Sequence, residues 1–439
     1  MNLKNLIKLY SDIGCTIVYI KTLAANDNSK NQIYLGGSFD VLNIFPIKDI
    51  TADDDGDWKR TRFKTKLDFY WLNEEGHTYH APDAQFILYP KYPEVRFSGF
   101  LRGCERAPSD LMANRIEGRL LFMGIDSTGK IFGYITDPKS HLSKEFNTRY
   151  KPETQGVFRV IQIENNKIQK DSRQDLLKEL KRIHKTGWIN SKRLGSKGEI
   201  LACESPNCGV YTLEAELGIT PNGYSEPDYK GWEVKQFNVR VFEKFKNEII
   251  TLMTPEPTGG FYVEKSVRAF IEKFGYEDKR GRKDRMNFGG IYKSGIKHAG
   301  TGLTLLLDGF DVESNKIKKA EGSIVLVGKK DVVAASWSFA SLLKHWNRKH
   351  NKACYVPSLS EKDPKKRYAY GNRIILGTGT DFTLFLKQMS MGNIVYDPAI
   401  KMENISLKPT IKRRSQFRIK SGFLQELYRK NEVVDLTKI

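Results

Sequence analysis

Apolar residues in the first third of the chain recur in a way that predicts strands, preceded by one short helix. Leu3, Leu6, Tyr10 and Ile13 follow helical spacing before Gly14, which is typical of an amphipathic helix that ends at a glycine. Four later stretches are rich in aromatic and β-branched residues and are strand-like, at 60–72, 84–90, 118–126 and 130–137. We therefore expect a β-rich N-terminal domain, a pattern that is compatible with a barrel.

Near the middle of the chain the pattern becomes helical. Val210, Leu213 and Leu217 fall on one helical face, and Gly218 supplies a stop signal. Glu214 lies beside this apolar stripe, so its side chain leans toward the core. An acid in that position usually needs a partner.

A strand is expected shortly after this helix, at 232–237. Side chains alternate along a strand, so Glu233 and Lys235 share one face. A loop rich in turn-forming residues delivers Asp228 beside the start of the strand. Two interpretations fit this pattern. Either the segment is an edge strand with solvated charges, or Asp228, Glu233, Lys235 and Glu214 converge on one point.

The chain is long enough for two or three domains, with 439 residues. A polar stretch at 164–175 reads as a linker. We place the β-rich domain at 1–165 and a second domain, with mixed helices and strands, at 166–439. A second helical stripe, at 339–346, belongs to the latter.

The set of Glu214, Asp228, Glu233 and Lys235, three acids and one lysine, suits a particular chemistry. Hard divalent cations prefer carboxylate oxygens, and Mg²⁺ typically takes one or two carboxylates and keeps several waters. Such an ion can polarise a phosphodiester and lower the pKa of a bound water. A nearby lysine can orient that water and stabilise negative charge on the phosphate. The group therefore predicts a phosphodiester hydrolase.

These residues also carry a resemblance to a known family. "PDYKGWEVK" is similar to the PD-(D/E)XK nuclease signature, and "GVYTLEAELGITPNGYSEPDYKGWEVKQF" (209–237) resembles the MvaI/BcnI group of restriction endonucleases. Three further stretches resemble other parts of that family: "HKTGWINSKRLGSKG", "AASWSFASLLKHWNRKHNKACYV" and "SQFRIKSGFLQELY". The resemblance covers roughly residues 170–439.

The resemblance implies a fold and a set of roles. The fold is an α/β (α+β) restriction-endonuclease-like core, similar to that of the mismatch-repair nickase MutH. Asp228 and Glu233 would bind Mg²⁺, Lys235 would position the attacking water, and Glu214 would support the metal site directly or through a water. Hydrolysis would leave 5′-phosphate and 3′-hydroxyl ends.

The charge of the chain agrees with a polyanionic partner. There are 72 Lys and Arg against 52 Asp and Glu, a net charge of +20. Two basic clusters stand out, and we expect both to contact DNA: Arg280, Arg282, Lys283 and Arg285 in the first, and Lys412, Arg413, Arg414 and Arg418 in the second. Arg418 matches an arginine of the family's closing strand. A solvated charged face is the alternative for both clusters.

The N-terminal domain also contains arginines, which form either a DNA-binding or effector surface or a solvated set on a structural domain. They are Arg96, Arg102, Arg106, Arg115 and Arg119. Some related enzymes carry an extra barrel-like domain that binds a second copy of the target.

The cysteines and the N-terminus indicate location. The five cysteines are scattered and odd in number, so we expect free thiols in a reducing cytoplasm. Cys203 and Cys208 invite a zinc interpretation, but no second Cys/His pair completes it. Charged residues interrupt the first apolar stretch, and no run of about 20 apolar residues exists, so neither a signal peptide nor a membrane span is expected.

The sequence thus predicts a cytoplasmic type II restriction endonuclease that requires Mg²⁺, cuts double-stranded DNA and acts as a monomer. A matching DNA methyltransferase would be its genetic partner in a phage-defence system. A MutH-like nickase or a modification-dependent nuclease is the first alternative. A non-catalytic DNA-binding regulator is the second, although such a protein has no use for the acids.

Overall fold

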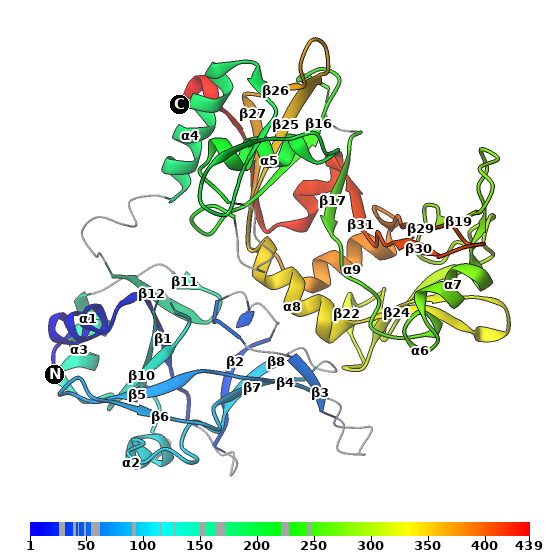
Figure 1. The fold of residues 1–439 in the computed structure, drawn as a ribbon. Coiled ribbons are helices and arrows are strands. Elements are labelled where there is room, and N and C mark those ends of the chain that lie inside the picture. Colours follow the sequence, from blue (N-terminus) through cyan, green and yellow to red (C-terminus); the bar gives the residue numbers. More distant parts are fainter. Residues whose placement is uncertain are drawn as a thin grey trace. The chain divides into compact units, whose positions relative to one another are not determined.

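The computed structural model describes residues 1–25, 31–37, 41–42, 44–47, 50–53, 62–89, 94–114, 116–126, 128–149, 154–163, 172–220, 228–244 and 247–439. The chain divides into two compact units, Met1–Lys170 and Asp171–Ile439 (Figure 1).

The first unit contains two mainly antiparallel sheets. One has the strand order β11 (Thr154–Gln155), β12 (Phe158–Gln162), β1 (Cys15–Thr22), β9 (Leu120–Asp126), β10 (Ile131–Thr136), β5 (Phe69–Leu72) and β6 (Thr78–His80). The other has the order β2 (Ile33–Gly36), β8 (Glu94–Ser98), β7 (Gln85–Tyr89), β4 (Arg62–Lys66) and β3 (Ile50–Asp53). The described residues of the four stretches expected to form strands do so, and 62–72 is divided into β4 and β5; residues 60, 61 and 90 lie outside the described ranges.

The helices of this unit are α1 (Leu3–Asp12), α2 (Ser109–Ala113) and α3 (His141–Arg149). The short N-terminal helix is therefore confirmed. Tyr10 of α1 is fully buried, and its hydroxyl donates to the carbonyl oxygens of Phe122 and Phe132, each at 3.2 Å. A side chain at Gly124 would collide with the Tyr10 ring, because a Cβ there would lie 2.4 Å from Tyr10 Cδ1.

Aromatic side chains join the two sheets. Phe69 of β5 lies 5.0 Å from Phe97 of β8 between ring centroids, and Phe45 contacts both Tyr19 of β1 and Phe86 of β7. The two sheets therefore pack face to face. The barrel arrangement is wrong for the described residues, because the end strands of each sheet pair on one side only, whereas a barrel closes on itself.

The second unit is built on a mixed sheet. Its strand order is β13 (Ile189–Asn190), β26 (Arg367–Tyr370), β25 (Lys352–Glu361), β27 (Arg373–Thr378) and β32 (Lys430–Asp435), and β16 (Glu233–Asn238) pairs in parallel with β25. Helices α4 (Ser172–Thr186) and α5 (Cys208–Glu216) share a buried core with this sheet, including Leu180, Leu213 and Val234. Mixed α/β content is thus as expected.

Two more helices complete the core of this unit. Helix α8 (Phe339–His350) packs on α9 (Phe382–Ser390), where the rings of Trp346 and Phe385 lie 4.9 Å apart. The four apolar residues predicted to line α8 are all fully buried: Phe339, Leu342, Leu343 and Trp346. Three short 3₁₀ helices are η2 (Lys329–Asp331), η3 (Ser421–Leu427) and η4 (Leu436–Lys438).

The remaining strands form small sheets, of which β19, β29 and β30 lie with α6 (Phe261–Glu264) and α7 (Val267–Phe274) at the end of the unit away from α4 (Figure 1). One sheet has the strand order β17 (Ile249–Met253), β31 (Phe417–Lys420) and β28 (Ile394–Tyr396). A second has the order β18 (Tyr276–Glu277), β19 (Arg285–Gly289), β29 (Ala399–Glu403) and β30 (Thr410–Lys412). A third has the order β20 (Thr304–Asp308), β23 (Ser323–Val327) and β24 (Val333–Ser338). Two-stranded pairs are β14 (Lys192–Leu194) with β15 (Ile200–Ala202), and β21 (Phe310–Asp311) with β22 (Lys316–Ile317).

The two units differ sharply in charge. Residues 1–170 hold 24 Lys and Arg against 21 Asp and Glu, a net charge of +3. Residues 171–439 hold 48 against 31, a net charge of +17. Attraction for a polyanion therefore comes almost entirely from the second unit.

The expectation of free thiols is wrong at one place. Cys203 and Cys208 form a disulfide across the tight loop that leads into α5, with their Cα atoms 5.7 Å apart. Short loops of this kind bring two cysteines within bonding range. Because the two sulfurs bond to each other, they are not zinc ligands. Cys15, Cys104 and Cys354 are free. Within the described ranges, no helix combines the length and the apolar character needed to cross a membrane.

Candidate active site

Strand β16 presents Glu233 and Lys235 on one face, as expected. Among the described residues, β16 pairs with β25 alone. The strand therefore lies at an edge of the sheet, as one of the two interpretations predicted. The charges, however, are not solvated. Glu233 is 3% exposed, and its Oε1 accepts a hydrogen bond from Lys235 Nζ at 2.8 Å. The structure thus provides a sheltered acid–base pair on an edge strand.

A tight turn folds Asp228 back onto the start of β16. Tyr229 and Trp232 exchange two backbone hydrogen bonds, and the two residues between them, Lys230 and Gly231, have φ values of 45° and 85°. Positive φ at both central positions is the signature of a type I′ turn. As a result, Asp228 Oδ2 accepts from the backbone N–H of Val234 at 3.0 Å. Pro227 of the motif lies outside the described residues.

Helix α5 supplies Glu214 from the adjoining layer. The predicted stripe is largely confirmed, since Leu213 and Leu217 are buried, and Gly218 follows the helix with φ +74°. Gly209 lets α5 approach β16 closely, because a Cβ there would lie 2.8 Å from Oε1 of Gln236. This close packing holds Glu214 toward the acids of the strand.

Burial and neighbouring charges raise the pKa values of Glu214 and Asp228. Burial, followed by the charges of Asp228 and Glu233, raises the pKa of Glu214 to about 7. Burial and the charge of Glu233 likewise raise the pKa of Asp228 to about 6, against the lowering effect of the Val234 N–H. The raised pKa values of Glu214 and Asp228 are those expected for carboxyl groups that are partly buried and lie near other negative charge. Perturbed pKa values of this kind are common at functional sites.

The donor set fits a divalent cation held by few protein ligands. Glu214 Oε2 and Glu233 Oε2 are buried and have no hydrogen-bond partner. Among the residues that the structure describes, no three His, Cys, Asp or Glu side chains are grouped closely enough to hold an ion together. Two carboxylates plus waters are what Mg²⁺ usually accepts. A cation at this place would therefore be held by at most two of these carboxylates, with waters completing its coordination.

Two residues near the acids were missed by sequence reasoning. Lys349, at the end of α8, is half-buried, and its charge lowers the pKa values of Glu214 and Asp228. His350 is fully buried and stacks on Trp346 at 4.1 Å, and burial followed by the charge of Lys235 lowers its pKa well below 6.5. His350 follows Trp346 by four residues and so lies on the same apolar face of the helix, which is the pattern from which its burial could have been predicted.

One sheet, formed by β18, β19, β29 and β30 and called the basic sheet below, brings most of the two basic clusters together, although they are far apart in the sequence. Arg285 begins β19 and the rest of the first cluster lies in the turn before it, whereas Lys412 ends β30 and Arg413 and Arg414 follow it. Arg418 lies on β31, in a different sheet. Strand β29 pairs with both β19 and β30. In the first cluster, Arg280, Arg282 and Lys283 are exposed, whereas Arg285 is mostly buried and forms ion pairs with Asp278 and Glu403. A cavity of about 280 Å³ lies over this sheet and is lined by Arg280, Arg282, Arg285, Asn287 and Lys401, among others.

The second cluster is also divided. Lys412, Arg413 and Arg414 are exposed. Arg418 on β31 is half-buried and donates to Asp397 Oδ2 at 2.5 Å. Arg285 and Arg418 are therefore held by carboxylates of the protein itself, while the other six cationic residues of the two clusters are exposed.

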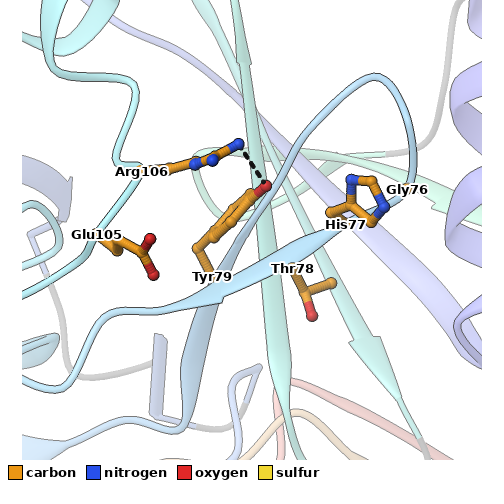
Figure 2. Close-up of a pocket in the computed structure, with 6 residues that line it drawn as sticks. All are labelled: Gly76, His77, Thr78, Tyr79, Glu105 and Arg106. Atoms are coloured by element: carbon orange, nitrogen blue, oxygen red, sulfur yellow. Dashed lines mark hydrogen bonds between the residues drawn. The ribbon is translucent and has the colours of Figure 1, made fainter.

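The first unit has a shallow cavity of about 570 Å³ near β6. Figure 2 shows its residues, including Arg106, whose Nη1 donates to the Tyr79 hydroxyl at 3.5 Å. The arginines of this unit behave differently from one another. Arg119 is buried and donates to backbone carbonyls, whereas Arg96 and Arg102 pair with Glu94 and Asp83. Arg115 lies outside the described residues.

Comparison with known proteins shows similarity to a restriction endonuclease family and to solved structures of one enzyme of that name. The model of the MvaI/BcnI restriction endonuclease family matches residues 177–428. The structure of the MvaI–cognate DNA substrate complex is similar with a TM-score of 0.44 and 19% identity, covering 61% of this chain and 99% of that chain. The structure of MvaI without DNA has a TM-score of 0.34 and 18% identity, with the same coverage. Comparison with curated proteins finds no match.

Proposed function

Because the chain belongs to the MvaI/BcnI restriction endonuclease family, we propose that it is a Mg²⁺-dependent type II endonuclease that cuts double-stranded DNA at a specific sequence. The observation that carries this proposal is the sheltered Glu233–Lys235 pair beside Asp228, at the place where Glu214 also converges. A PD-(D/E)XK, MutH-like assignment of the core rests on the same four residues.

Each residue then has a role. Asp228 and Glu233 would bind the ion directly, and Glu214 would contact it through a water. When bound, such an ion polarises the phosphodiester and lowers the pKa of a coordinated water. Glu233 holds the Lys235 ammonium in place, so that it can orient the attacking water and stabilise charge developing on the phosphate. Hydrolysis in this way yields 5′-phosphate and 3′-hydroxyl ends.

The basic sheet is the proposed DNA contact. Exposed Arg280, Arg282, Lys283 and Lys412 suit phosphates, and Arg413 and Arg414 suit base edges. Arg285 and Arg418 act from fixed positions, because carboxylates already hold them. One set of active-site acids per chain is consistent with a monomer that cuts the strands in separate events. A matching methyltransferase and a role in phage defence belong to the same proposal.

Plasmid digestion tests the function. With Mg²⁺, unmodified plasmid is expected to pass through a nicked circle to linear DNA with 5′-phosphate ends, and methylation at the site is expected to block cleavage. A product that stays nicked would identify a nickase. Cleavage of methylated DNA alone would identify a modification-dependent nuclease. Binding without any cleavage would support a regulator instead.

The first unit is proposed to modulate rate or target choice as a DNA-binding or effector domain, since the four active-site residues all lie in the second unit. A chain that starts at Asp171 is expected to fold and to cleave DNA with Mg²⁺, while losing any preference for plasmids with two sites over plasmids with one. Cleavage rates on matched one-site and two-site plasmids measure this. If the full-length and shortened proteins behave alike on both plasmids, residues 1–170 have another role.

A further inference from the structure

An apolar side chain stands at the tip of the basic sheet. Leu407, in the turn that joins β29 to β30, is 90% exposed. In Figure 1, β19, β29 and β30 lie together at the end of the unit opposite α4. Contact with a partner would remove this apolar surface from water and so contribute favourable free energy to binding.

The tip that carries Leu407 is anchored. Its N–H donates to the carbonyl of Asn404 at 3.3 Å, and Asn404 has φ 56°, which closes the turn. The neighbouring Ser406 N–H donates to Oδ1 of Asp284 at 2.7 Å. Asp284 lies in the connection between β18 and β19, so each turn of the sheet is tied to the other.

The base of the same sheet is also fixed. Phe288 of β19 packs on Phe270 of α7, with 4.6 Å between ring centroids. Arg285 links Asp278 with Glu403 of the neighbouring strand at 3.1 Å each. The tip therefore extends from a supported sheet, and the position of Leu407 is largely set before any partner binds.

The surroundings of Leu407 identify its partner by charge. Lys408 is adjacent, and further exposed cationic residues lie on the same two hairpins and the segment after them: Arg280, Arg282, Lys283, Lys412, Arg413 and Arg414. An apolar residue within this many cations suits a surface that is anionic outside and apolar within. Duplex DNA has this construction, with phosphates flanking stacked bases.

We propose that Leu407 is a wedge that inserts between adjacent base pairs of the bound duplex, while the surrounding cations hold the phosphates. This inference rests on the proposed function and adds a residue that unstacks DNA. Proteins that insert leucine in this way partly unstack a base step and bend the duplex. The wedge would thus distinguish easily deformed steps from stiff ones, in addition to any reading of base edges.

The test uses the full-length protein and 2-aminopurine, whose fluorescence rises when it is unstacked. Duplexes containing the site mapped by plasmid cleavage carry 2-aminopurine at each position in turn, and Ca²⁺ replaces Mg²⁺ to prevent cutting. The wild type is expected to raise fluorescence several-fold at one step. Leu407→Ala should lose this signal and bind at least about tenfold more weakly. Leu407→Met should keep it.

Two controls separate the wedge from general effects. Ile200→Ala removes another apolar side chain of the same unit that is 68% exposed, and it should leave signal and affinity unchanged. Lys283→Ala should weaken binding and flatten its salt dependence, whereas Leu407→Ala should leave the salt slope unchanged because no charge is lost.

Three results would overturn the wedge. One is a wild type that binds and cuts DNA without a fluorescence rise at any position. Another is a Leu407→Ala variant with an undiminished rise. The third is a Leu407→Ala protein that differs from the wild type only in thermal stability or oligomeric state, because that result would place Leu407 in a contact with protein and not with DNA. A wild type that fails to bind DNA would overturn the proposed function as well, so the two failures are distinguishable.

Discussion

Lys235→Ala is expected to bind DNA with near wild-type affinity and to cut it at least about 10²- to 10³-fold more slowly. In the proposed mechanism the ammonium group of Lys235 acts on the attacking water and the phosphate, whereas the cations proposed to bind DNA lie mostly on or beside the basic sheet. The measurements are single-turnover cleavage of plasmid with Mg²⁺ and, separately, DNA affinity with Ca²⁺.

The structure supplies controls for this variant. Lys235→Ala leaves Glu233 buried without its ion-pair partner, so some loss of stability is expected. Lys235→Met keeps most of the side-chain volume, and a similar loss of rate would show that the charge matters. Lys230→Ala removes an exposed lysine of the same motif and should cut normally. Wild-type cleavage by Lys235→Ala would show that the active-site assignment is wrong.

Asp228→Asn is expected to abolish Mg²⁺-dependent cleavage and yet to stabilise the metal-free protein at pH 8. The pKa values of Asp228 and Glu214 are about 6 and about 7 in the folded chain, above their ordinary values. The folded state therefore holds these protons more tightly than the unfolded state. The resulting stabilisation is present below pH about 4 and is lost as pH rises through 6 and 7.

An ion bound to these acids should offset that loss. For the wild type we expect Mg²⁺ or Ca²⁺ to raise the Tm more at pH 8 than at pH 5.5. Asparagine can still accept the hydrogen bond from the Val234 N–H but carries no charge. The free energy of unfolding of Asp228→Asn without metal should therefore be about 1–3 kcal/mol higher at pH 8 than that of the wild type, and its Tm should change little when metal is added. Thermal unfolding at both pH values, with and without the ion, measures this.

Asp331→Asn is the matched control, because Asp331 is exposed and its φ of 56° suits asparagine. It should change neither the Tm response nor cleavage. An unchanged metal response in Asp228→Asn, or cleavage at the wild-type rate, would remove Asp228 from the metal site.

What the sequence could predict depends on how local the interaction is. The strand at 233–238, the helix that carries Glu214 and the grouping of four polar side chains follow from alternation, helical spacing and a turn, all within one short stretch. The same local reasoning found the N-terminal helix and strands. The fold of the first unit was harder, because open sheets and barrels share one alternating pattern.

Long-range pairing could not be predicted from such patterns. Lys349 reaches the acids because β25, which directly follows α8, pairs with β16 although the two strands are far apart in the sequence. Arg285 and Arg418 look like free cations in the sequence, but distant strands and loops place Glu403 and Asp397 against them. The Cys203–Cys208 bond shows a further limit, since an odd count of cysteines does not exclude one local pair.

In the second unit, the residues proposed for catalysis and those proposed for DNA contact lie in separate parts of the sequence, so either set can change without the other. The four residues proposed for chemistry lie in one continuous stretch, from Glu214 to Lys235, while the basic sheet is assembled from two hairpins far away in sequence. If these turns contact DNA as proposed, insertions, deletions or substitutions in the β18–β19 and β29–β30 turns would alter that contact without changing the acids. Chimeras that exchange only these turns are then expected to keep the reaction of the recipient while changing its target.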